Sequence, residues 1–122
     1  MTKEKVLYYV ANGFKIPAYE ENTVPTDATF PYITYQVVTD SFGSEVPITL
    51  SLWYRSTSWL EINEKAREIS VAVGRGGFIV PCDGGRIWIK RGTPFAQNMG
   101  DESDDLIKRK LINITAEFLT VD

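Results

Sequence analysis

The most constraining feature of this chain is the alternation of apolar and polar side chains along two long segments, residues 46–56 and 107–120. The apolar positions of the first are Ile48, Leu50, Leu52 and Tyr54, and those of the second include Ile112, Ile114, Ala116 and Phe118. A period of two puts every second side chain on the same face of an extended strand. Both segments are therefore predicted to be strands with one buried face and one polar face.

Three shorter segments complete the predicted sheet. Residues 31–38 alternate in the same way and are rich in Tyr, Thr, Ile and Val. They are expected to pair with 46–56 as an antiparallel hairpin across a turn at 40–45. Residues 78–82 and 86–91 flank an Asp-Gly-Gly turn and predict a second hairpin.

Two helices are predicted between the strands. Residues 2–14 have apolar side chains at helical spacing, and Thr2 can cap the first turn. Ser58 and Glu61 have the spacing of a capping box, and Gly74 is suited to end the second helix. The apolar stripe of that helix consists of Trp59, Ile62, Ala66, Ile69 and Val73.

The order of these elements is helix, two strands, helix, three strands. Residues 15–30 and 92–106 hold prolines, glycines and acidic side chains and are predicted to be long loops. With 122 residues and 43% hydrophobic residue types, the chain can bury a single core. We expect one α+β domain spanning residues 1–122, with an antiparallel or mixed sheet of about five strands and both helices packed on one face.

The residue inventory excludes several kinds of chemistry. The chain has no histidine and one cysteine, Cys82. A Ser-His-Asp or Cys-His system needs an imidazole, a zinc site needs several Cys or His ligands, and an internal disulfide needs two cysteines. We therefore predict a protein that is not an enzyme, with no catalytic, cofactor-binding or metal-binding residues.

Two local motifs have simple structural interpretations. Gly74-Arg75-Gly76-Gly77 follows a helix and precedes a strand, the reverse of a phosphate loop, so it predicts a helix end and a turn. The acidic run 101–105 has Leu106 where a calcium loop requires glycine. It is interpreted as a solvated acidic loop or, as the second alternative, a loop that faces a partner.

Charge and hydropathy limit the possible partners. The 13 basic and 16 acidic residues give a net charge of −3, and this balance does not indicate a polyanion partner. No run of about 18 apolar residues predicts a membrane span. The N-terminal residues lack the apolar segment of a signal peptide, so we expect an intracellular protein.

Several exposed or charged side chains are candidates for an interface. Trp53 and Trp88 lie on the polar faces of their strands, either as interface residues or beneath the helices. Lys108, Arg109 and Lys110 could contact phosphate or simply end a solvated strand. The candidate interface residues are Trp53, Arg55, Trp88, Lys90, Arg91, Asp101, Glu102, Asp104, Asp105 and Arg109.

Several short motifs occur in a recognisable order, ahead of the closing strand at 112–119. They are Phe30-Pro31-Tyr32-Ile33-Thr34-Tyr35-Gln36, Leu52-Trp53-Tyr54-Arg55-Ser56, Gly74-Arg75-Gly76-Gly77, Asp83-Gly84-Gly85, Gly92-Thr93-Pro94-Phe95-Ala96-Gln97 and Asp105-Leu106-Ile107-Lys108-Arg109. Over residues 28–121 this ordered set resembles the tail terminator, or tail completion, proteins of long-tailed phages and prophages.

The resemblance implies a structural α+β subunit that forms a homo-oligomeric ring, commonly of six copies. Such a ring caps the tail tube, ends its polymerisation and joins it to the neck or connector proteins, with DNA only as passing cargo. The implied location is the host cytoplasm during assembly and then the tail or neck of the virion. Two alternatives remain open: a head-tail connector or stopper, and, in another class, a small nucleic-acid-binding module.

Overall fold

The computed structural model of this chain describes residues 1–37, 45–99 and 104–120. Its elements are α1 (Lys3–Asn12), β1 (Ala18–Glu20), β2 (Tyr32–Val37), β3 (Glu45–Arg55), α2 (Leu60–Val73), β4 (Phe78–Cys82), β5 (Gly85–Met99) and β6 (Ile107–Thr120). Apart from Glu45, the turn predicted at 40–45 lies outside the described residues.

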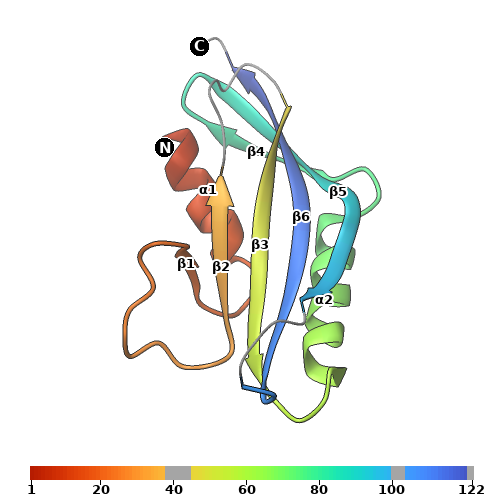
Figure 1. The fold of residues 1–122 in the computed structure, drawn as a ribbon. Helices are drawn as coiled ribbons and strands as arrows, with labels where there is room; N and C mark the ends of the chain where they lie inside the picture. The colour runs from red at the N-terminus through yellow and green to blue at the C-terminus, as the bar shows by residue number, and fades with distance from the viewer. Residues whose placement is uncertain (38–44, 100–103, 121–122) are drawn as a thin grey trace.

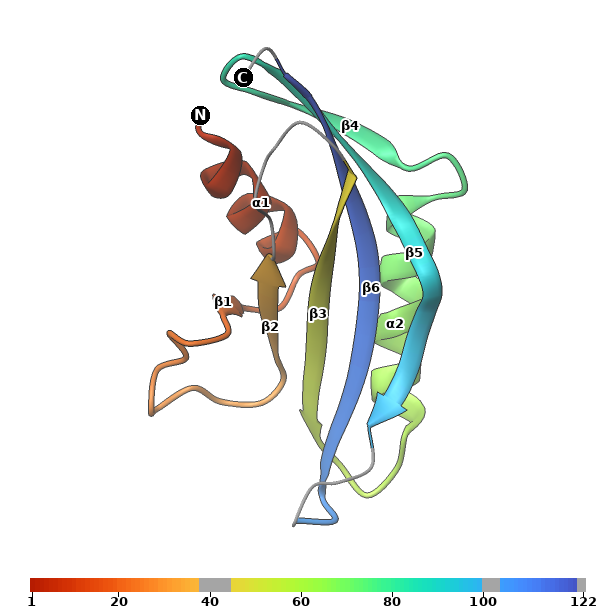
Figure 2. The same ribbon diagram turned by 45° about the horizontal axis from the view of Figure 1, so that its top comes forward.

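The strands form one curled sheet in the order β1-β2-β3-β6-β5-β4. β1 pairs with β2 in parallel, and the other neighbouring strands are antiparallel. Both helices lie on the same side of this sheet, with α1 near β2 and α2 behind β5 and β6 (Figures 1 and 2). The α+β class is confirmed, and the described part of the sheet has six strands rather than about five.

The core lies between the sheet and the two helices. β3 and β6 are central neighbours, and their alternate side chains point to the helices, as the period of two predicts. Leu50 and Ile112 are paired and fully buried there. The helix residues Ile62, Ile69 and Val73 pack into the same cluster. The opposite face of the sheet carries no helix, and we call it the helix-free face.

The two predicted loops are the main corrections to the fold. β5 continues to Met99, so the loop predicted at 92–106 is mostly strand. An irregularity between Arg91 and Ala96 interrupts the pairing, which resumes when Ala96 meets Ile112. In the first loop, β1 has only three residues and is therefore too short to show a period of two.

The helix ends follow the sequence only in part. The Thr2 side chain accepts a hydrogen bond from the Lys5 N–H, so the predicted cap of α1 is confirmed. The predicted capping box of α2 is wrong. The Ser58 hydroxyl accepts from the Leu60 N–H at 3.2 Å, and the helix begins only at Leu60. A bond two residues ahead closes a tight turn instead of capping the third residue of a helix.

The glycines after α2 have the predicted role. Gly74 ends the helix with a φ of 79°, and Gly77 has a φ of 73°. A Cβ atom on Gly77 would lie 2.1 Å from the backbone oxygen of Ile89. The turn therefore brings β4 against β5 at a distance that excludes any side chain at residue 77.

Candidate interaction surfaces

The first candidate site is a row of side chains across the helix-free face. Tyr32, Trp53 and Arg109 are register partners on the adjacent strands β2, β3 and β6. The Tyr32 and Trp53 rings are stacked, with centroids 6.3 Å apart and planes 21° apart. The Arg109 guanidinium lies 4.8 Å from the centroid of Trp53. Trp53 is thus flanked by an aromatic ring from one strand and a cation from another.

Two buried hydroxyl groups fix the orientation of this row. The indole Nε1 of Trp53 donates to Thr34 Oγ1 at 2.9 Å. Arg109 donates through Nε and Nη2 to Ser51 Oγ, at 3.2 and 3.1 Å. Thr34 and Ser51 are the buried polar residues of the described chain, at 6% and 3% exposure. The polar ends of Trp53 and Arg109 therefore point into the sheet, and their hydrogen bonds hold them in one geometry.

Two further aromatic rings extend the row toward β1. Tyr19 contacts Tyr32 edge to face at 6.0 Å, and Phe30 lies 5.3 Å from Tyr32. We call Tyr19, Phe30, Tyr32, Trp53 and Arg109 the aromatic row; all five side chains are half-buried. The sequence analysis named Trp53 and Arg109 but missed the other three. Alternation already placed Tyr32 opposite Ile33, whereas the position of Tyr19 depends on the parallel pairing of β1 with β2.

A second group lies at the other end of the helix-free face. Lys90 Nζ lies 4.5 Å above the Trp88 ring, 3.3 Å from Glu45 and 3.9 Å from Glu117. The Trp88 indole donates to the backbone oxygen of Gly76 at 2.8 Å. We call Glu45, Trp88, Lys90 and Glu117 the charged group. One lysine faces two carboxylates here, so the group carries a small negative excess.

Neither Trp53 nor Trp88 lies beneath a helix, as one of the two sequence-based alternatives supposed. Both point away from the helices, because the core residues of their strands occupy the alternate positions. Each is instead half-covered by neighbours on its own face. The interface interpretation of these two tryptophans stays a prediction.

Arg55 and Asp104 meet near the start of β6. Their side chains form an ion pair at 3.0 Å. Asp104 Oδ1 also accepts from the Leu106 N–H at 2.9 Å. This backbone hydrogen bond lowers the pKa of the Asp104 carboxyl below its ordinary value, and the Arg55 charge lowers it further. Exposed pairs of this kind stabilise a fold only weakly.

The remaining acidic candidates give less information. Asp105 is exposed, and its backbone oxygen accepts a hydrogen bond from Lys108 Nζ. Asp101 and Glu102 lie outside the described residues. The interface role predicted for this acidic segment stays a prediction.

Arg91 is separate from the other candidates because it interacts with α2. Its Nε and Nη2 donate to the backbone oxygen of Ser70, at 3.1 and 2.7 Å. Ser70 lies in the last turn of α2, where carbonyl oxygens carry the negative end of the helix dipole. A guanidinium at this position stabilises the helix end and ties β5 to α2.

The three consecutive basic residues on β6 are divided between the two faces, as their alternation predicts. Lys110 donates to the side-chain oxygens of Asn63 and Asn98, at 2.9 and 2.6 Å, and burial lowers the pKa of its ammonium group. Lys108 lies 5.8 Å from the Trp59 ring, on the same side as the helices. Arg109 belongs to the aromatic row on the opposite side. These three cations therefore do not form one basic surface.

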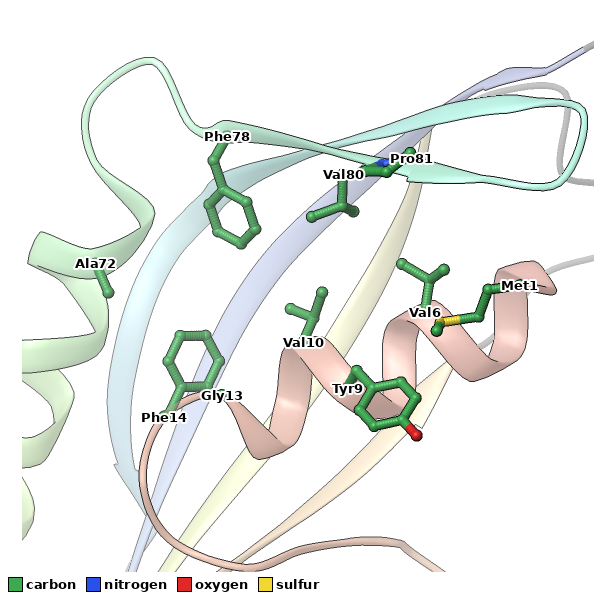
Figure 3. Close-up of a pocket in the computed structure, with 10 residues that line it drawn as sticks. All are labelled: Met1, Val6, Tyr9, Val10, Gly13, Phe14, Ala72, Phe78, Val80 and Pro81. Carbon is green, nitrogen blue, oxygen red and sulfur yellow. The ribbon is translucent and has the colours of Figure 1, made fainter.

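An apolar groove on the helix side is a site that the sequence analysis did not predict. It has a volume of about 520 Å³ and lies between α1, the end of α2 and β4. Figure 3 shows Phe78 and Val80 of β4 directed toward Val10 of α1, with Phe14 and Ala72 at one end. Exposed Tyr9, at 52%, stands at its rim. Its position depends on the packing of three elements that are distant in sequence.

The described residues offer little for metal or membrane binding. No group of three or more His, Cys, Asp or Glu side chains gathers within the parts of the chain that the structure describes. The single cysteine, Cys82, is half-buried at the end of β4. Neither described helix combines the length and apolar character that crossing a bilayer requires.

A comparison of the chain with models of known protein families gives no match. None of the curated proteins matches it either. The proposal below therefore rests on the resemblance carried by residues 28–121 and on the surfaces just described.

Proposed function

We propose that this chain is a structural phage tail component, a tail terminator subunit that forms a ring, caps the tail tube and joins it to the neck. The ordered motifs over residues 28–121 support this function. The α+β fold is of the class that the resemblance implies. On this proposal the subunit acts by assembly in the host cytoplasm and stays in the tail or neck of the virion.

The single observation that carries the proposal is the presence of two dissimilar surfaces on opposite sides of one sheet. The aromatic row lies on the helix-free face, and the apolar groove lies on the helix side. A ring closes by rotation when each subunit presents one surface to the subunit before it and a different surface to the next. Ring closure then ends growth, because no subunit keeps an unused surface.

Purified protein mixed with isolated tail tubes tests this function. We expect closed rings, commonly of six copies, by negative-stain electron microscopy, and a ring at one end of each tube. Light scattering should give the matching mass. A strict monomer that caps no tube at any concentration would contradict the proposal.

Deleting the gene distinguishes the neighbouring alternative. Loss of a tail terminator should give overlong tails, whereas loss of a head-tail connector or stopper should leave tails of normal length unjoined to heads. The nucleic-acid alternative predicts DNA binding that weakens steeply as salt is raised. We expect no such binding, because Lys108, Arg109 and Lys110 are divided between two faces.

A further inference from the structure

The edge strand β1 directs part of its backbone away from the sheet. The Ile33 N–H donates to the Pro17 oxygen at 2.8 Å, and the Glu21 N–H donates to the Tyr35 oxygen at 3.0 Å. In a parallel ladder these bonds involve every second residue of the edge strand. The N–H and C=O groups of Ala18 and Glu20 therefore point outward, where the next strand of a larger sheet would bind.

The side chain of Asn12 occupies this outward position beside Ala18. Its Oδ1 accepts from the Ala18 N–H at 3.0 Å, and its Nδ2 donates to the Ala18 oxygen at 3.4 Å. Nδ2 also donates to the Tyr8 oxygen at 3.0 Å, which anchors the amide to α1. One amide side chain thus makes the same pair of bonds to Ala18 that a neighbouring strand would make.

The next outward oxygen of β1 is also satisfied within the chain. The backbone N–H and the hydroxyl of Thr23 both donate to the Glu20 oxygen, at 2.9 and 3.0 Å. Three outward groups of this edge, the two of Ala18 and the oxygen of Glu20, are therefore matched by Asn12 and by the turn that follows β1.

The opposite edge of the sheet is closed in a related way. β4 contains Pro81, which has no N–H to offer an incoming strand. The Asp83 N–H, at the turn after β4, donates to the Met1 oxygen at 2.8 Å. Open edges pair readily with other chains, and proteins commonly block them. Both ends of this sheet carry such blocks.

We propose that Asn12 closes the β1 edge against strand addition by a second copy of this chain. The copies then meet through their side-chain surfaces and not through a shared sheet. This inference goes beyond the proposed function and holds whether or not the copies form a ring. Its test can fail while rings still form, and it can succeed where no rings form.

The substitution Asn12→Ala tests the inference, with Asn22→Ala in the exposed turn after β1 as the matched control. We expect amide exchange at Ala18 to become about three- to tenfold faster, because one hydrogen bond is lost. We also expect a new associated species that grows with concentration in sedimentation velocity. Asn22→Ala should show neither change.

A second substitution identifies the surface that this species uses. Glu20→Pro removes the outward N–H of Glu20, so Asn12→Ala combined with Glu20→Pro should return to the assembly state of the unmodified protein. If the new species persists in the double variant, or if Asn12→Ala produces none, the inference is wrong. If Asn12→Ala does not fold, the unmodified protein decides. A scalar coupling across the hydrogen bond from Ala18 N to Asn12 Cγ supports the inference, and its absence overturns it.

Discussion

The two faces of the sheet are built from different side chains. The face toward α1 and α2 is aliphatic, and residues such as Leu50, Ile89 and Ile112 are fully buried there. The helix-free face carries half-buried aromatic rings and charged groups, among them Trp53 and Lys90. Both sets come from the same strands and alternate along them.

This difference separates stability from interaction. Burial of apolar side chains against the helices provides most of the folding free energy. The helix-free face contributes stacking and hydrogen bonds between neighbours on a surface that solvent still reaches. A substitution on the first face should therefore unfold the protein, and one on the second should mainly change what the protein contacts.

The largest effect is expected from Ile69→Ala on the helix side. Ile69 is fully buried between α2 and the sheet. Removing its outer carbons leaves a cavity, which should lower the free energy of unfolding by about 2–5 kcal/mol. Urea unfolding measures this change. A loss as small as that of an exposed residue such as Val71→Ala would show that the core is not where we place it.

The next effect concerns the turn that joins the two layers. Gly77→Ala should lower the free energy of unfolding by roughly 1–2 kcal/mol from its left-handed backbone alone. The contact with the Ile89 oxygen adds to this loss. Gly76→Ala is the control, because a Cβ there meets nothing within 4 Å. Equal melting temperatures for the two variants would contradict the close approach at Gly77.

A smaller loss of stability is expected from Trp53→Ala on the helix-free face. Stacking on Tyr32 and the contact with Arg109 together contribute about 1–2 kcal/mol. The main effect should fall on assembly, with dissociation at concentrations where the unmodified protein is associated. Sedimentation equilibrium measures it. If Trp53→Ala assembles normally, the aromatic row is not the interface.

The smallest effect is a dependence on pH at Asp104. Its pKa is lowered in the folded state, so the stabilisation is present above the ordinary pKa and is lost as pH falls through the folded pKa. The difference in unfolding free energy between the unmodified protein and Asp104→Asn should therefore shrink as the solution is acidified. Asp27→Asn in an exposed turn is the control. A difference that grows on acidification would reverse the assigned direction.

Alternation along the long strands was enough to predict the class of fold. The buried positions of β3 and β6, the β2–β3 hairpin and the opposite orientations of Lys108 and Arg109 all follow from a period of two. The end of α2 at Gly74 also follows from the sequence. These features depend on neighbours along the chain or on one adjacent strand.

The parts that were missed depend on contacts between distant segments. β1 forms because three residues pair with β2, and β5 extends past Pro94 because β6 continues beside it. The aromatic row combines side chains from four segments of the chain, and the groove combines three. Sequence patterns therefore located Trp53 and Arg109 but could not show that Tyr19 lies beside them.

Fluorine NMR of protein labelled with 5-fluorotryptophan tests most directly the claim that the helix-free face is the surface that meets other subunits. Trp53 and Trp88 lie on that face, and Trp59 lies on the helix side as an internal control. As concentration drives assembly, the Trp53 and Trp88 resonances should shift while that of Trp59 stays in place. Assembly that leaves Trp53 and Trp88 unchanged would contradict the account.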